Sequence, residues 1–326
     1  MRRISLETIR EAASVVYDLA VRTPLVRLHL PGNPAGTSAG PLEVYLKLET
    51  LQPIGSFKIR GAYNAVRRLP PAERARGVWT VSAGNAAQGV ALAARAMGAA
   101  CSVMVIETAP QTKLRAIERL GASIVKASYD EAWRTVESGG SDRMPGTFVH
   151  PFDDDRFISG NGTIGLEIVE DLPDVDAVVA PLGGGGLLSG IACALRALRP
   201  SVRVYAAEPE TAAPLATSLA AGRASYFPDW RPSFVDGAGG KSVLPTMWPL
   251  LSQWLSGSIV VSLDDVGRAM REVADRVHVI AEGAAGCAVA AALSGRAGPG
   301  KVVAVVSGGN IDLGTFASVV GAGPTG

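Results

Sequence analysis

A lysine occupies an unusual place in residues 53–66, which read PIGSFKIRGAYNAV. Ser56 is a favourable N-cap, and residues 57–69 carry apolar side chains at near-helical spacing. This pattern predicts a helix that has Lys58 in its first turn. The first turn carries the positive end of the helix dipole and favours acidic residues. Arg60 is expected to add further positive charge beside Lys58.

Two explanations of Lys58 are open from this segment alone. The side chain extends into solvent at a cost of a few tenths of a kcal/mol, roughly the low end of the dipole effect. Alternatively, nearby positive charge lowers the pKa of the amine. A neutral amine is a nucleophile, and a lysine that forms a Schiff base needs this activation. The rest of the chain has to decide between them.

The composition is that of a globular protein with ordinary charge. The chain has 326 residues, of which 48% are hydrophobic and 38 are glycine, and its net charge is +1. This length suits two domains, and no basic cluster indicates nucleic acid or an anionic membrane as a partner. Cys101, Cys193 and Cys287 lie far apart without metal-ligand spacing, so they are predicted to pack as small buried residues.

No segment predicts secretion or membrane insertion. The N-terminus, MRRISLETIREAAS, has no apolar core of a signal peptide. Residues 177–195 carry no charge, but Pro181 and four successive glycines interrupt them. A strand, a turn and a helix explain this segment better than a membrane span. We therefore expect a cytoplasmic enzyme.

Short apolar runs alternate with longer amphipathic segments along most of the chain. Strands are predicted at 42–49, 77–82, 100–106, 123–127, 176–181, 202–208, 258–262 and 301–307. Besides 57–69, helices are predicted at 6–19, 86–97, 111–120, 129–138, 157–171, 187–198, 211–221, 263–276 and 283–294. This alternation predicts an α/β fold with a doubly wound, largely parallel sheet. The polar segment 138–146 is the favoured internal boundary, and residues 222–245 form a second irregular stretch.

Three glycine-rich turns follow predicted strands. They are SAGNAAQG at 82–89, LGGGGLLSG at 182–190 and SGGN at 307–310. Ligands bind at the carboxyl ends of strands in open parallel sheets. The three turns are therefore predicted to converge on one crevice.

The four-glycine turn is the clearest anion site. Backbone N–H groups and the dipole of the following helix would bind a phosphate there, although the lysine of a Walker A loop is missing. Gly184, Gly186 and Ser189, with Glu208 after the next strand, approximate a dinucleotide fingerprint. GNGTIG at 160–165 also matches that pattern, but no strand precedes it, so we interpret it as accidental.

The order SFKIRGA, SAGN, GGGG, SGGN resembles the fold type II pyridoxal-phosphate enzymes, in the threonine/serine dehydratase and serine racemase branch. The resemblance runs from RTPL at 22–25 to SGGNIDL at 307–313. It implies two doubly wound parallel-sheet domains with the active site in the cleft between them. The large, cofactor-binding domain would comprise residues 1–51 and 148–326, and the small domain residues 52–147.

The resemblance also implies a role for each matching residue. Lys58 would hold pyridoxal 5'-phosphate covalently and exchange the proton on the substrate α-carbon. Phe57 would pack on the cofactor ring, Asn85 would bond its hydroxyl, and Ser307 would face its nitrogen. The phosphate would lie on Gly183, Gly184, Gly185 and Gly186. The substrate carboxylate would bind at Ser82, Ala83, Gly84, Asn85, Ala86 and Gln88, with Ser82 also counted as catalytic.

Departures from the family pattern refine the expected activity. Serine racemases of this branch carry a serine where this chain has Ala83, which argues against efficient racemisation. Many dehydratases have a histidine where this chain has Ala86, so a bulkier β-substituent is a possible substrate feature. The chain ends soon after SGGNIDL, like the short catabolic enzymes, and predicts no feedback inhibition by isoleucine.

The metal site of the family is only partly matched. Glu208 and the carbonyl of Ala212 correspond to ligands, but Pro214 replaces the acidic one. Loss of a carboxylate removes charge that a hard cation needs. No metal is therefore expected, with Glu208 and Ala212 as weak candidates.

These observations predict a pyridoxal-phosphate-dependent ammonia-lyase. It would convert a β-hydroxy α-amino acid of the L-threonine or L-serine type, with room for a bulkier β-substituent, to a 2-oxo acid and ammonia. We expect a homodimer with no nucleic-acid or membrane partner. The alternatives are an amino-acid racemase, a non-catalytic cofactor-binding or regulatory protein, and a nucleotide-dependent oxidoreductase that gives Lys58 no role.

Overall fold

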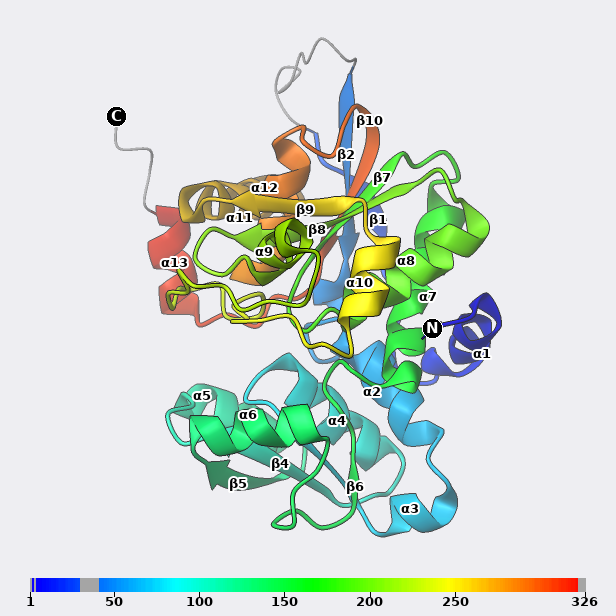
Figure 1. The fold of residues 1–326 in the computed structure, drawn as a ribbon, viewed down its shortest axis with the longest axis vertical. Coiled ribbons are helices and arrows are strands. Elements are labelled where there is room, and N and C mark those ends of the chain that lie inside the picture. The colour runs from blue at the N-terminus through cyan, green and yellow to red at the C-terminus, as the bar shows by residue number, and fades with distance from the viewer. Residues whose placement is uncertain (1, 3, 30–40, 322–326) are drawn as a thin grey trace.

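The computed structural model describes residues 2, 4–29 and 41–321 and builds them around two sheets (Figure 1). The larger sheet has six strands in the order β1 (Leu25–Arg27), β2 (Leu42–Leu48), β10 (Gly300–Val306), β7 (Ala177–Pro181), β8 (Arg203–Pro209) and β9 (Gly257–Val261). The smaller sheet has four, in the order β5 (Ser123–Ala127), β4 (Cys101–Ile106), β3 (Val78–Val81) and β6 (Thr147–Phe148). Among the strand pairs of the described residues, β1 and β2 alone are antiparallel. The predicted α/β fold is confirmed.

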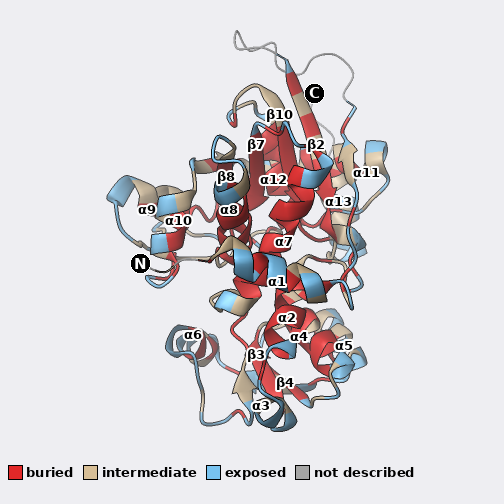
Figure 2. Ribbon diagram, turned by 90° about the vertical axis from the view of Figure 1, so that its right-hand side faces the viewer, coloured by how far each residue is buried: buried red, intermediate tan, exposed pale blue. Residues whose placement is uncertain are grey.

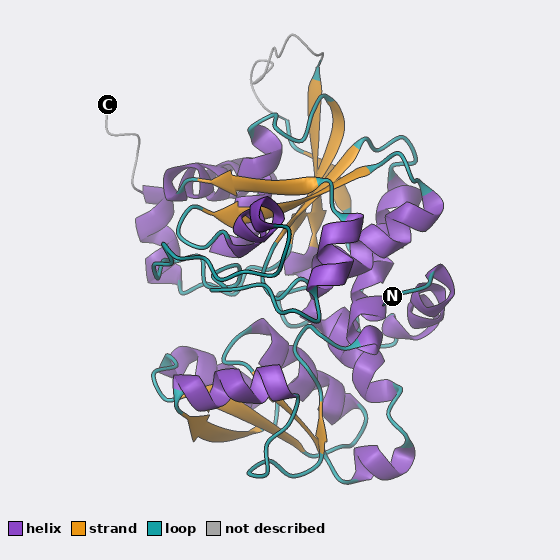
Figure 3. Ribbon diagram, viewed as in Figure 1, coloured by secondary structure: helices purple, strands orange, loops and turns teal. Residues whose placement is uncertain are grey.

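Helices cover both sheets (Figure 3). They are α1 (Leu6–Val16), α2 (Lys58–Arg67), α3 (Pro71–Ala75), α4 (Asn85–Ala96), α5 (Gln111–Arg119), α6 (Tyr129–Ser138), α7 (Asp155–Asp171), α8 (Gly186–Leu198), α9 (Pro214–Ala221), α10 (Trp248–Trp254), α11 (Leu263–Val277), α12 (Gly283–Leu293) and α13 (Leu313–Gly321), with a 3-10 turn at Glu49–Leu51.

The strands of the large sheet are apolar on both faces. In β7, Val178 and Ala180 belong to a core shared with α7 and α8, whereas Ala177 and Val179 belong to a second core shared with α11 and α12. Alternate residues of a strand point to opposite faces, so these are the two faces of one sheet. Figure 2 shows β7, β10 and α12 as the buried centre of this half. The continuous apolar runs of the sequence follow from this double coverage.

Several short elements lie outside the sequence predictions. These are β1, the 3-10 turn, α3, β6, α10 and α13. Each has two to nine residues, too few for a clear periodicity. The four-stranded sheet lies within 78–148 and so reaches one residue beyond the predicted small-domain boundary. The boundaries of the two domains stay a prediction.

Ser56 is not the N-cap of α2. The helix begins at Lys58 with Phe57 at the N-cap position and no side-chain cap. Ser56 instead forms an isolated β-bridge with Gly308, and its buried hydroxyl has no hydrogen-bond partner. The chain is extended here because it pairs with the segment that follows β10.

Two interpretations of glycine-rich segments are confirmed. Residues 160–165, which match GxGxxG, lie inside α7 and do not form a phosphate loop. Residues 177–195 form β7, a turn and most of α8. Across the part of the chain that the structure describes, no helix has the length and apolar character to cross a membrane. Cys101, Cys193 and Cys287 are buried and free of disulfides.

Candidate active site

A cavity of about 620 Å³ lies where the three glycine-rich turns meet. Its walls come from the ends of β3, β7 and β10 and from the starts of α2, α4 and α8. The predicted crevice is therefore present. Every predicted cofactor and substrate residue lines it: Phe57, Lys58, Ser82, Ala83, Gly84, Asn85, Ala86, Gln88, Gly183, Gly184, Gly185, Gly186 and Ser307.

Lys58 reaches into this cavity from the first turn of α2. Its ammonium Nζ donates a hydrogen bond to the carbonyl oxygen of Pro151 at 2.7 Å. The rings of Phe57 and Phe157 lie 5.3 and 5.4 Å from Nζ. Burial lowers the pKa of Lys58 to about 8, against an opposing effect of the Glu282 carboxylate. The lysine is therefore partly neutral at physiological pH, as a Schiff-base lysine needs to be.

Arg60 does not activate Lys58, contrary to the expectation from the sequence. Its guanidinium is fully buried and lies between the carboxylates of Glu49, at 2.8 Å, and Glu167, at 2.5 Å. Lys47 pairs with Glu167 as well, at 2.7 Å. The positive charge of Arg60 is thus compensated within a buried network that joins α2 to α7. Desolvation, rather than repulsion between cations, lowers the pKa of Lys58.

The four-glycine loop presents unused hydrogen-bond donors. Within the described chain, the backbone N–H groups of residues 183–188 have no protein acceptor, whereas the next one, on Ser189, donates to the carbonyl of Gly185. Gly185 adopts a left-handed conformation with φ 93° and is the N-cap of α8. Free amides at a helix N-terminus fit a phosphate group. This part of the cavity therefore suits the phosphate of the predicted cofactor.

The glycines of this loop also pack closely on protein atoms. A Cβ on Gly184 would overlap the ring of Phe152, and one on Gly186 would lie 2.5 Å from the carbonyl oxygen of Phe152. A Cβ on Gly183 would lie 2.8 Å from the carbonyl oxygen of Gly237. In the structure, neighbouring protein atoms already exclude a larger side chain at these positions.

The turn before α4 has a second set of unused amides. The hydroxyl of Ser82 accepts a hydrogen bond from the N–H of Gly84 at 3.1 Å. Gln88 donates from its backbone to Gly84, and in the described structure the amides of residues 85–87 have no protein acceptor. Such a nest at a helix start suits a carboxylate. Binding of the substrate carboxylate at this turn stays a prediction.

Ser307 follows β10 and is 2% exposed. Its carbonyl accepts from the backbone N–H of Phe57 at 3.0 Å, which ties the end of β10 to the start of α2. Ser307 lines the cavity, and its hydroxyl has no hydrogen-bond partner among the described residues. A free hydroxyl in this position fits the predicted contact with the ring nitrogen of the cofactor.

Asn85 belongs to a polar cluster that the sequence analysis did not identify. Its amide nitrogen donates to Oε1 of Glu282 at 2.8 Å, and its amide oxygen accepts from the side chain of Asn310 at 2.7 Å. Burial raises the pKa of Glu282 to about 7. The sequence offered a sign of both residues. Asn310 ends the glycine-rich turn SGGN, and Glu282 is a charged residue directly before a helix that has no charge. One amide hydrogen of Asn85 remains for the predicted bond to the cofactor hydroxyl.

A largely apolar wall was also missed. Helix α6 contributes Tyr129, Ala132, Trp133 and Val136 to the cavity. The apolar residues Ile106, Ala109, Phe152 and Leu187 complete the wall. Ala86 lines the same cavity and is only 3% exposed. Aromatic and aliphatic groups therefore border much of this cavity.

Glu208 and Ala212, the weak metal candidates, lie outside this cavity lining. The Glu208 carboxylate accepts from the backbone N–H groups of Leu215 at 2.8 Å and Ala216 at 2.9 Å, and from the Ser258 hydroxyl. Both carboxylate oxygens are thus used at the start of α9. No cluster of three or more possible metal-binding side chains occurs in the described ranges.

Comparison with known proteins places this geometry in a family. The family model described as "Pyridoxal-phosphate dependent enzyme" matches residues 16–308. An L-threonine ammonia-lyase of Thermotoga maritima is 38% identical over 98% of this chain and 79% of its own length. A putative threonine dehydratase of Sinorhizobium fredii is 36% identical over 98% of this chain and 96% of its own.

Solved structures agree with this assignment. Maize serine racemase superimposes with a TM-score of 0.86 at 32% identity, covering 97% of both chains. Threonine deaminase isoform 2 of Solanum lycopersicum gives a TM-score of 0.83 at 31% identity, covering 99% of this chain and 96% of its own.

The chain therefore belongs to the pyridoxal-phosphate-dependent enzymes of fold type II. Within that class its relatives are threonine dehydratases and serine racemases, and it is a threonine dehydratase-like lyase. The family and cofactor predicted from the sequence are confirmed. The individual roles of the site residues stay predictions.

Proposed function

We propose that this enzyme is an ammonia-lyase for a β-hydroxy α-amino acid whose β-substituent is larger and more apolar than that of serine or threonine. The overall reaction converts R–CH(OH)–CH(NH₃⁺)–COO⁻ to R–CH₂–CO–COO⁻ and ammonium. The hydroxyl leaves as water, and a water molecule is consumed when ammonium is released, so atoms balance. The largely apolar lining of the cavity, to which Ala86 contributes, is the observation that carries the preference for a large R group.

Each polar feature of the cavity has a task in this proposal. Pyridoxal phosphate supplies an electron sink for the substrate α-carbon. Lys58, with a pKa near 8, removes the α-proton at Nζ. The unused amides at the start of α4 hold the substrate carboxylate, and those of residues 183–188 hold the cofactor phosphate.

The neutral hydroxyl of Ser307 suits elimination in particular. It does not hold a proton on the ring nitrogen as a carboxylate would, so the electron sink is weaker. When the β-hydroxyl leaves, it takes away the negative charge that develops at the α-carbon. Elimination therefore proceeds with a cofactor that is only a weak electron sink. A racemase needs a base on the second face of the substrate. Serine racemases of this branch carry a serine for that role at the position where this chain has Ala83. We therefore favour elimination over racemisation.

Ala86 is the residue that we expect to set the side-chain preference. An apolar cavity that a small substrate leaves unfilled forfeits contacts worth roughly 20 cal/mol per Å² of its surface. Apolar complementarity typically discriminates about 10- to 200-fold per methylene-sized difference. We expect kcat/KM for 3-phenylserine or 3-hydroxyleucine to exceed that for serine by at least about ten-fold on this basis.

A panel of β-hydroxy amino acids with coupled detection of ammonia tests the proposal. Ala86→His should reverse the ranking because the imidazole fills the space, whereas Ala86→Ser adds little bulk and should leave it unchanged. Serine or threonine as the best substrate, with the same ranking in Ala86→His, would contradict the size preference. Absence of ammonia release with every substrate would instead support a non-catalytic protein.

The assembly is a separate proposal. The family resemblance suggests a homodimer, and sedimentation equilibrium of the cofactor-loaded protein tests it. A mass equal to one chain at micromolar concentration would exclude the dimer.

A further inference from the structure

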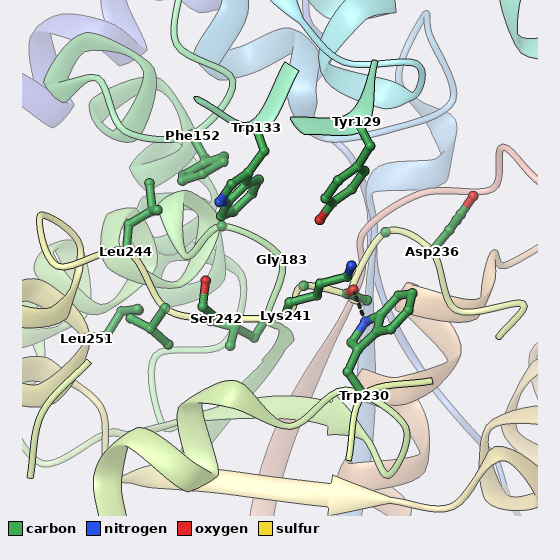
Figure 4. Close-up of a pocket in the computed structure, with 16 residues that line it drawn as sticks. Tyr129, Trp133, Phe152, Gly183, Trp230, Asp236, Lys241, Ser242, Leu244 and Leu251 are labelled. Atoms are coloured by element: carbon green, nitrogen blue, oxygen red, sulfur yellow. Dashed lines mark hydrogen bonds between the residues drawn. The ribbon is translucent and has the colours of Figure 1, made fainter. Parts of the chain in front are cut away.

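A second cavity, of about 320 Å³, lies beside the active site (Figure 4). It is bordered by α6 on one side and by the irregular segment 230–244 on the other. The two cavities are neighbours, and the glycine loop after β7 forms part of both. The residues that line both are Tyr129, Trp133, Phe152, Gly183, Gly184, Asp236 and Gly237. The volume is within the range of small-molecule sites in proteins.

Lys241 is a cation held inside this cavity by aromatic rings. Its ammonium Nζ lies 4.4 Å from the ring centroid of Tyr129 and 4.4 Å from that of Trp230. Trp230 is itself fixed, because its indole Nε1 donates to the carbonyl of Gly239 at 2.9 Å. Figure 4 shows Lys241 between the two rings. The ammonium is therefore positioned before any ligand arrives.

This cation has no counter-ion in the described parts of the chain. The salt bridges of these residues include none to Lys241. Asp236 also lines the cavity, but its carboxylate pairs with Lys113 of α5. An ammonium has three hydrogen-bond donors, and aromatic rings offer it no lone pairs. The ammonium of Lys241 can therefore still form an ion pair with an anion.

The remaining lining tells what kind of anion fits. Ser242 places a hydroxyl in the cavity, and this hydroxyl has no partner in the described structure. Leu244, Leu251 and Trp133 supply apolar surface around it. A phosphate or sulfate alone would leave that surface uncovered, whereas a carboxylate on an aromatic or aliphatic body would cover it.

We propose that this cavity is a second binding site, which takes a carboxylate carried on an aromatic or other apolar body. Lys241 pairs with the carboxylate, Ser242 donates to it, and Trp133 and Trp230 pack on the body. The carboxylate can come from the far end of a long substrate or from a separate small effector. Either source presents the same carboxylate to Lys241. Binding of a carboxylate at this cavity does not require that the enzyme turn over a substrate.

Isothermal titration of the cofactor-loaded enzyme with benzoate tests the site. Benzamide, the neutral analogue of similar shape, is the ligand control. A charge-assisted hydrogen bond typically contributes about 10- to 100-fold to an equilibrium, so benzoate should bind at least about ten-fold more tightly than benzamide. Lys241→Met should remove this difference, and Lys126→Met, at an exposed lysine of β5, should retain it.

Two further variants keep the test decisive if Lys241→Met alters the melting temperature or the cofactor absorbance. Lys241→Arg retains the charge and should retain selectivity for benzoate. Ser242→Ala should weaken benzoate at least about three-fold, the effect of a modest hydrogen bond. Equal affinity for benzoate and benzamide in the parent, or benzoate affinity unchanged in Lys241→Met, would overturn the proposal.

Kinetics separate the two sources of the carboxylate. If the cavity holds the far end of a substrate, benzoate should compete with 3-phenylserine bearing a para-carboxylate and not with serine. If the cavity holds an effector, benzoate should change kcat for serine as well. Either pattern supports the site, provided that Lys241→Met abolishes it. An effect that persists in Lys241→Met comes from another site and counts against the proposal.

Discussion

The pKa of Lys58 gives a prediction that can be worked through from the structure. Burial lowers it to about 8, from an ordinary value of 10.5. At pH 7 about one lysine in ten would then be neutral, compared with about one in 3000 at the ordinary value. Because the neutral form is the nucleophile, the cofactor-free protein should gain reactivity as the pH rises and level off above about 8.

Competitive labelling of the cofactor-free enzyme with acetic anhydride measures this directly. The extent of acetylation of the Lys58 peptide is read by mass spectrometry, with the exposed Lys126 as internal reference. Glu282→Gln removes the carboxylate that raises the pKa of Lys58, so its midpoint should move below 8. The rate of regain of visible absorbance on adding pyridoxal phosphate should follow the same curve.

Two outcomes would refute this reasoning. Reactivity of Lys58 that keeps increasing ten-fold per pH unit up to pH 10 would show that burial does not lower its pKa. An upward shift of the midpoint in Glu282→Gln would show that Glu282 does not act through its negative charge. At pH 8 that carboxylate is mostly ionised, since its own pKa is about 7.

The remaining predictions concern the cofactor and the buried network. Lys58→Ala should abolish turnover and the visible band of the covalently held cofactor, and an unchanged band would reject Lys58 as the anchor. Gly184→Val should weaken cofactor binding strongly, because its side chain would overlap Phe152 and displace the loop; equal cofactor affinity by fluorescence titration would place the phosphate elsewhere. Arg60→Met leaves the buried Glu49 without a cation and Glu167 with Lys47 alone, and should destabilise the fold by about 3–5 kcal/mol. Urea unfolding measures this, and a loss below about 1 kcal/mol would show that the network contributes little.

The sequence by itself determined the order of elements and the place of the site. Apolar runs separated by amphipathic segments specify a parallel sheet covered on both faces, as β7 and β10 confirm. Glycine-rich turns after three strands specify where a ligand binds, because parallel strands bring their carboxyl ends to one edge. Lys58 stood out since its charge opposes the dipole of its own helix. All of these signals are local in the chain.

The tertiary structure decided what surrounds these residues. Arg60 lies beside Lys58 in sequence, yet Glu49 and Glu167 compensate its charge, 11 and 107 residues away. Asn85 bonds Glu282 across 197 residues. The cause of the lowered pKa of Lys58 is burial, which depends on every segment that closes the cavity. The aromatic wall of α6 and the cation of Lys241 belong to the halves built on the small and the large sheet, and they meet because these halves pack together (Figure 1). Periodicity predicts which face of an element is buried, but not which distant side chains it is buried against.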